Sequence, residues 1–185
     1  MITLLADSDQ LDINNFLNET LGSALIDSGC TSSVCGEFWL KAYIDSLSSK
    51  EKEEITYHSS NRWFIFGNGR KVKSSKSVTV PLHFGYEKTS IRTDVVSEDI
   101  PLLFSKASLT KAKAVIDFEN SEINIMGQNL PLQETTSGHL LLSLKRALDP
   151  QEPQAKRILF AIAENNGASV WFLHVRLRLR RPIGL

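Results

Sequence analysis

One acidic side chain of the sequence stands where it could act as a catalyst. Asp27 follows an apolar run at residues 24–26 and precedes Ser28 and Gly29. A strand ending at this point would hold the carboxylate rigidly in a partly apolar site. Gly29 would let a partner backbone approach closely, and the Ser28 hydroxyl could form a hydrogen bond across the site. Such a triplet is also common in ordinary turns, so the rest of the chain must decide between the two interpretations.

Carboxylates hydrolyse a peptide bond when two of them share one proton. Like charges about 3 Å apart cannot both ionise, so one stays protonated while the other is charged. One then deprotonates a bound water, and the other protonates the scissile carbonyl oxygen. This chemistry needs no metal and no cofactor. The chain holds one such triplet, because Asp45 and Ser46 precede Leu47 rather than a glycine. A site of this kind therefore requires two copies of Asp27 on the two-fold axis of a homodimer.

The surrounding sequence predicts mostly short strands. Apolar residues at i, i+3, i+4 and i+7 predict a helix over 40–47, and the spacing of Ser48 and Glu51 is that of a capping box. Alternation over 78–84 predicts a strand in which Pro81 favours an edge or a bulge. The capping box predicts that a second short helix begins at Ser48, and a further short helix is expected at 109–114. Further strands are expected at 21–26, 90–96, 100–104, 114–118, 122–126 and 139–144. Strands separated by frequent turns predict an all-β sandwich or barrel.

A hairpin is expected after the helical region. The apolar residues 63–66 lead into Gly67, Asn68 and Gly69, whose residue types tolerate the positive φ of tight hairpin turns.

Taken in this order, residues 21–144 resemble a retropepsin-like aspartic protease, the type encoded by retroviruses and retrotransposons. The resemblance rests on the Asp27 triplet, the following residues 31–33, the glycine-tipped hairpin and the apolar segment at 100–109. Residues 114–118 and 137–140 resemble the transposon-derived branch in particular. The resemblance implies an all-β protomer, a closed barrel or sandwich, with a flap hairpin and one or two short helices.

The resemblance also implies an aspartic endopeptidase that acts as a homodimer on an extended peptide or polyprotein. Its catalytic residues would be Asp27, Ser28 and Gly29, and the flap that binds the substrate would be formed by Phe66, Gly67, Asn68 and Gly69. Two residues depart from the family pattern: Cys30 replaces an alanine, and Ser105 replaces a glycine that lets chains pack behind the catalytic loop. Ser105 keeps open the alternative of an inactive, domesticated domain that dimerises or binds peptides.

Other reactive side chains favour structural interpretations. Cys30 and Cys35 lack the spacing of zinc ligands, and we expect no metal site. The charge of Asp27 would raise the pKa of Cys30 and so weaken it as a nucleophile. Asp117 has no glycine after it, so a surface position on a strand is expected for this residue.

The charge of the chain is divided unevenly. The 185 residues carry 21 basic and 21 acidic side chains, which excludes a wholly basic nucleic-acid binder. Residues 145–185 hold eight basic and three acidic side chains, and residues 1–144 hold 13 and 18. We expect a leader or linker at 1–20, the protease-like domain at 21–144 and a poorly folded basic extension at 145–185. The less favoured interpretation of that extension is contact with nucleic acid.

The location expected from the sequence is intracellular and cytoplasmic. The first residues lack the basic region of a signal peptide, and no apolar stretch is long enough to cross a membrane.

Overall fold

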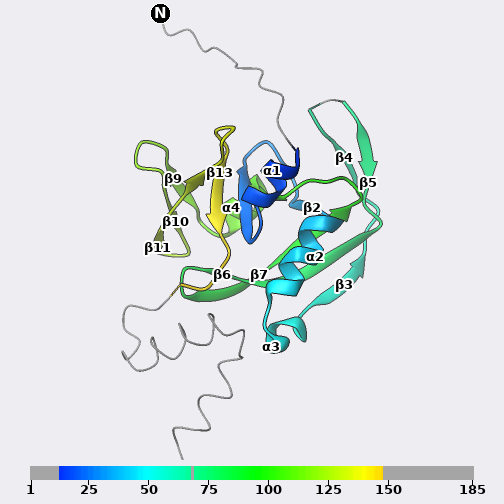
Figure 1. Cartoon of the computed structure of the whole chain (residues 1–185), viewed down its shortest axis with the longest axis horizontal. Coiled ribbons are helices and arrows are strands. Elements are labelled where there is room, and N and C mark those ends of the chain that lie inside the picture. Colours follow the sequence, from blue (N-terminus) through cyan, green and yellow to red (C-terminus); the bar gives the residue numbers. More distant parts are fainter. Residues whose placement is uncertain (1–12, 68, 148–185) are drawn as a thin grey trace, which may run out of the picture.

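The computed structural model describes residues 13–67 and 69–147 (Figure 1). The predictions for residues 1–12 and 148–185 lie outside these ranges. Most of the described chain consists of strands joined by turns and short helices. The expectation of a mainly β protein is therefore confirmed. Four short helices are present in the described ranges, where the family resemblance implies one or two.

Eight strands form the main sheet, in the order β12-β13-β1-β8-β2-β7-β6-β3. Their bounds are β1 Ser23–Asp27, β2 Val34–Gly36, β3 Thr56–Ser59, β6 Lys76–Phe84, β7 Glu87–Val96, β8 Leu102–Ser105, β12 Gln133–Glu134 and β13 Leu140–Ser143. β12 and β3 are the two edge strands of this sheet, and in the described ranges they do not pair with each other. Barrel closure, which the family resemblance implies, is thus not found among them.

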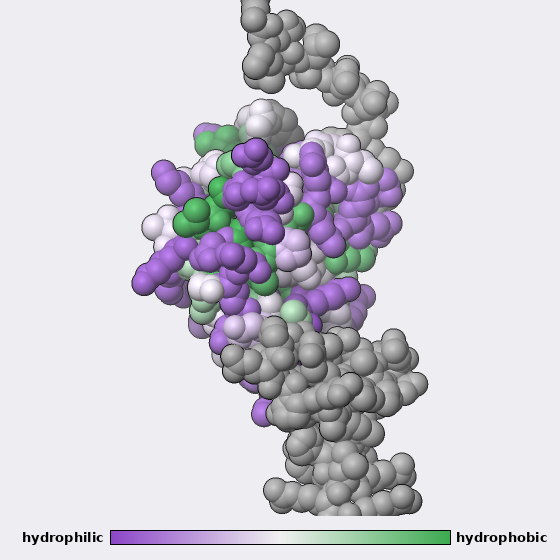
Figure 2. Space-filling model, turned by 90° about the vertical axis from the view of Figure 1, so that its left-hand side faces the viewer, coloured by the Kyte–Doolittle hydropathy of each residue, from purple (hydrophilic) through white to green (hydrophobic). Residues whose placement is uncertain are grey.

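Two smaller sheets complete the strand structure. β4 Trp63–Ile65 and β5 Lys71–Lys73 form a two-stranded hairpin, and β9 Val115–Asp117, β10 Glu122–Ile125 and β11 Gln128–Pro131 form a three-stranded sheet. Apolar atoms come to the surface among polar ones on the side of the molecule where this three-stranded sheet lies (Figure 2). Val115, Phe118 and Met126, which belong to its strands and turns, are exposed, whereas Ile123 and Ile125 are buried.

Strand β1 lies near the middle of the main sheet. It pairs antiparallel with β13 and parallel with β8, so its backbone is hydrogen-bonded on both sides. Ala24 and Leu25 of this strand are buried, as the apolar run in the sequence predicted.

The long strands β6 and β7 have one apolar and one polar face. Val78, Val80 and Leu82 of β6 are buried in the core, and the residues between them lie on the opposite face. β6 is not an edge strand, because it lies between β7 and β3. Pairing with β3 extends only to Thr79, however, so Pro81 lies beyond the end of β3. The missing N–H of Pro81 therefore breaks no pairing with β3.

The helices are α1 Ile13–Glu19, α2 Glu37–Ser46, α3 Ser49–Lys52 and α4 Lys106–Lys111. α2 packs its Trp39, Leu40 and Tyr43 side chains against the sheet, and the rings of Trp39 and Tyr43 stack with their centroids 4.9 Å apart. The predicted capping box is present at the start of α3. The longest of these helices, α2, has 10 residues, so none in the described ranges can span a membrane.

Residues 13–20 are part of the folded domain, although the sequence assigned them to a leader. Leu17 and Thr20 are buried, and the Trp39 indole donates a hydrogen bond to the Thr20 carbonyl oxygen at 3.1 Å. The Glu19 carboxylate accepts bonds from the backbone and the hydroxyl of Thr136. These partners lie far along the chain, which is why the polar composition of the segment did not predict its packing.

Candidate active site

The carboxylate of Asp27 emerges at the end of β1, as predicted. Parallel pairing places Asp27 opposite Ser105, the last residue of β8. Asp27 is half-buried, whereas Ser28 and Gly29 in the turn that follows are exposed. The buried strand thus fixes the backbone position of Asp27, and the exposed turn leaves the triplet accessible to a second molecule.

The turn after β1 orients the carboxylate through its own backbone. Asp27 Oδ1 accepts hydrogen bonds from Gly29 N at 2.9 Å and from Cys30 N at 3.1 Å. In the described ranges no hydrogen bond goes to Oδ2, so this oxygen can contact a water or another carboxyl group. A Cβ atom at position 29 would lie 3.2 Å from Asp27 Oδ1. Glycine at this position therefore permits the close wrapping of the turn around the carboxylate.

Three serine side chains form a hydroxyl cluster beneath this loop. Ser33 Oγ lies 3.1 Å from Ser105 Oγ and 2.9 Å from Ser108 Oγ, and it accepts a bond from Ser105 N at 3.1 Å. Ser33 and Ser105 are buried. Lys106 N donates to Cys30 O at 3.0 Å, which attaches the same loop to the start of α4. The cluster thus joins two segments 72 residues apart behind the Asp27 loop.

Ser105, which departs from the family pattern, is accommodated by this cluster. Its side chain is 0% exposed, and it caps α4 by accepting a bond from Ser108 N at 3.3 Å. The buried hydroxyl therefore has partners, and no distortion of β8 is needed to hold it.

The hairpin expected from residues 63–69 is present, formed by β4 and β5. Phe66 N donates to Arg70 O at 3.2 Å and Gly69 N to Phe66 O at 2.8 Å. Gly69 has a φ of +76°, and glycine adopts such a positive φ without steric cost. Gly67 is exposed, and Asn68 lies outside the described residues.

The base of the hairpin packs near the Asp27 loop. Phe64 and Val72 form a buried cluster with Val34 and Val96, and Cys30 and Phe66 lie against this cluster. Trp63 and Ile65 alternate with Phe64 and are 62% and 67% exposed. The hairpin is therefore anchored on one face and presents large apolar side chains on the other.

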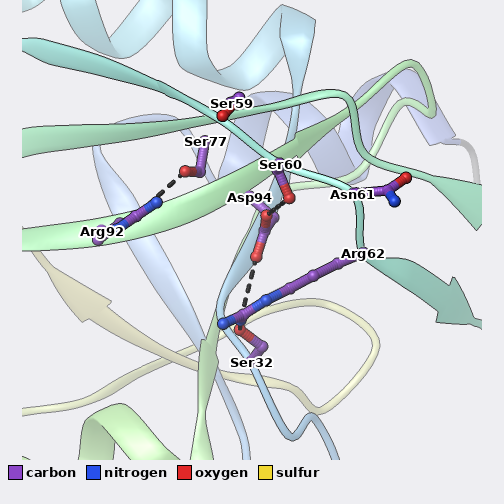
Figure 3. A pocket seen from close by; sticks show the side chains of 8 residues that line it. All are labelled: Ser32, Ser59, Ser60, Asn61, Arg62, Ser77, Arg92 and Asp94. Carbon is purple, nitrogen blue, oxygen red and sulfur yellow. Dashed lines mark hydrogen bonds and ion pairs between the residues drawn. The ribbon is translucent and has the colours of Figure 1, made fainter.

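Sequence reasoning missed two charged residues beside the loop, Arg62 and Asp94. The Arg62 guanidinium donates to the Ser32 hydroxyl and lies 3.3 Å from Asp94 Oδ2 (Figure 3). Ser60 donates to Asp94 Oδ1 at 2.5 Å. The one acidic residue of the strand predicted over 90–96, Asp94, was the available signal, but the sequence could not predict its partner.

The thiols are poor nucleophiles at this site. Burial raises the pKa of Cys30, and the neighbouring Asp27 carboxylate raises it further, in the direction that the sequence predicted. Burial raises the pKa of Cys35 to about 12. Asp117 is exposed on β9, as expected. The described part of the chain contains no cluster of three His, Cys, Asp or Glu residues that could hold a metal ion.

Comparison with known proteins gives distant structural likenesses alone. No family model matches the sequence, and no curated protein shows significant similarity to it. One similar solved structure is the retroviral protease-like domain of Ddi1 from Leishmania major. The two share 15% sequence identity with a TM-score of 0.36, and the match covers 58% of this chain and 81% of that one.

Proposed function

We propose that this protein is a retropepsin-like aspartic endopeptidase that acts as a homodimer. The observation that carries the proposal is the setting of Asp27: a half-buried carboxylate at the end of a central strand, held by two backbone N–H groups of its own turn. The anchored hairpin nearby supports the same function, as does the order of these features along the chain, which resembles the retropepsins.

The proposed reaction uses one Asp27 from each subunit. The two carboxyl groups share a proton across the two-fold axis; one activates a water, and the other protonates the carbonyl oxygen of the scissile bond. Protonation of the leaving nitrogen then completes hydrolysis. Exposed Ser28 and Gly29 fit this arrangement, because the partner subunit would cover them in the dimer.

The proposed substrate is an extended peptide, free or within a polyprotein. Its backbone would pair with the hairpin and the floor of the cleft, as peptides do when they add a strand to a sheet. In this proposal Phe66, Gly67, Asn68 and Gly69 form the flap over the peptide. No side chain lies within 4 Å of a Cβ built at Gly67 or Gly69, so the tip has room to move.

Substitution of Asp27 tests the proposal. The purified wild-type protein is assayed on a peptide library at about pH 5, and its mass in solution is measured by light scattering. We expect a dimer whose cleavage activity is lost in Asp27→Asn. Asp45→Asn, at an exposed position on α2, serves as the matched control. Cleavage by Asp27→Asn at the wild-type rate would refute the mechanism.

The second candidate function is an inactive domain that dimerises or binds peptides, and it derives from Ser105 in place of glycine. This alternative predicts no cleavage and no tight complex with a transition-state mimic such as a statine peptide. Tight binding of that peptide would exclude it.

A further inference from the structure

A polar cavity of about 340 Å³ lies beside the Asp27 loop (Figure 3). Ser32 contributes from the loop after Asp27, Ser60 and Arg62 from the chain entering the hairpin, and Ser77, Arg92 and Asp94 from β6 and β7. Backbone bonds from Ser60 N to Ser75 O and from Ser74 N to Arg62 O fix the hairpin entry against its exit. The cavity therefore lies between the proposed catalytic loop and the base of the proposed flap.

The floor of the cavity is the polar face of β6 and β7. Ser77 pairs directly with Asp94, and Arg92 precedes Asp94 by two residues, so the three side chains share one face. Val78 and Val95 lie on the other face and are buried in the core. The alternation that places apolar residues in the core thus also collects polar ones on this side.

Asp94 is fully engaged inside the cavity. Its side chain is 6% exposed, and its two oxygens accept bonds from Ser60 and from Arg62. The Arg62 cation compensates its charge, and Arg62 also binds the Ser32 hydroxyl. Asp94 is therefore a structural acid that joins the hairpin entry, the loop and the sheet.

Arg92 is the second cation that lines the cavity, and the pairing of Arg62 with Asp94 leaves its charge uncompensated. It is exposed, and its Nε donates to the buried Ser77 hydroxyl at 3.1 Å. Within the described ranges it forms no ion pair with an acidic side chain. The Nη donors of an anchored guanidinium match the geometry of a carboxylate. With Asp94 neutralised by Arg62, the cavity carries a net positive charge.

We propose that this cavity is a subsite for an acidic side chain of the peptide substrate, which the Arg92 guanidinium binds. The inference rests on the proposed function, because it assigns a specificity to the same cleft. A glutamate or aspartate side chain of a peptide lying between the loop and the hairpin would enter the cavity from its open side. A basic side chain is disfavoured, because the acid within the cavity is already paired.

Peptide binding to the Asp27→Asn protein tests the subsite without cleavage. In an array of short peptides, Glu, Gln or Lys is placed at each position in turn, and binding is followed by fluorescence anisotropy. We expect one position at which Glu binds about tenfold more tightly than Gln, as for a hydrogen bond to a charged group. Arg92→Gln should abolish that preference, and Arg92→Glu should reverse it in favour of Lys. Lys41→Gln, an exposed substitution on α2, should leave it unchanged.

Cleavage of the same array by the wild-type protein separates the two proposals. Cleavage without any preference for an acidic residue would overturn the subsite and leave the protease function standing. Selective binding of acidic peptides that Arg92→Gln abolishes, without cleavage, would support the subsite and refute the protease. A Glu preference that survives in Arg92→Gln would also overturn the assignment. Urea unfolding confirms that each Arg92 variant is folded.

Discussion

Replacement of Ser33 by alanine should destabilise the fold at the point where the Asp27 loop is supported. Ser33 is 3% exposed, and its hydroxyl is the acceptor for the backbone N–H of Ser105, which is fully buried. The same hydroxyl contacts those of Ser105 and Ser108. Alanine removes all three interactions and adds no new group.

The expected loss follows from these contacts. A buried N–H without an acceptor costs about 1–3 kcal/mol. Ser105 Oγ and Ser108 Oγ still lie 3.3 Å from each other, so these two hydroxyls keep one partner each. We therefore expect Ser33→Ala to lower the free energy of unfolding by about 2 kcal/mol. With a urea m-value of about 2 kcal/mol/M, the midpoint falls by about 1 M.

Urea unfolding followed by tryptophan fluorescence measures this loss, with Trp39 buried in the core as the probe. The matched control is Ser90→Ala at an exposed position of β7, where we expect less than about 0.5 kcal/mol. A double-mutant cycle with Ser108→Ala should give a coupling of about 0.5 kcal/mol or more. A midpoint for Ser33→Ala equal to that of the control would refute the assignment of Ser33 as the buried acceptor.

Three further predictions concern other parts of the fold. A methyl group at Gly36 would lie 2.2 Å from the Glu98 carbonyl oxygen, so Gly36→Ala should cost about 3 kcal/mol in urea unfolding, whereas Gly67→Ala, which meets no atom within 4 Å, should cost little. Ser48→Ala removes the capping box of α3 and should lower stability by about 1 kcal/mol, measured in the same way; an unchanged midpoint would show that the cap contributes nothing. Burial lowers the pKa of His83 below 6.5, against the opposing effect of Glu51, so the folded protein binds fewer protons than the unfolded chain. Stability should then fall as the pH drops below about 6.5, and His83→Gln should flatten that slope; an identical slope in the variant would contradict it.

Local features of the fold were predictable because short stretches of sequence determine them. The apolar run before Asp27 predicted β1 and the position of its carboxylate. Helical spacing predicted α2, and the Ser48 and Glu51 pair predicted the cap of α3. The glycine-rich turn predicted the β4–β5 hairpin. Each of these signals involves residues close together in the chain.

Other elements were missed because they are short or because their partners are distant in the chain. β2, β3, β11 and β12 have only two to four residues each, too few to show an alternating pattern. The segment around α1 is polar, and it is held by contacts with Trp39 and Thr136 that its own composition does not reveal.

The sequence by itself determined the nature of the acid, the strand that carries it and the hairpin that follows. Only the tertiary structure decided what surrounds that acid. Parallel pairing of β1 with β8 places Ser105 beside Asp27, and the packing of the hairpin entry on β7 brings Arg62 to Asp94. Pairing register and packing depend on contacts between segments distant in the chain. The polar cavity and the serine cluster therefore appear only once the chain is folded.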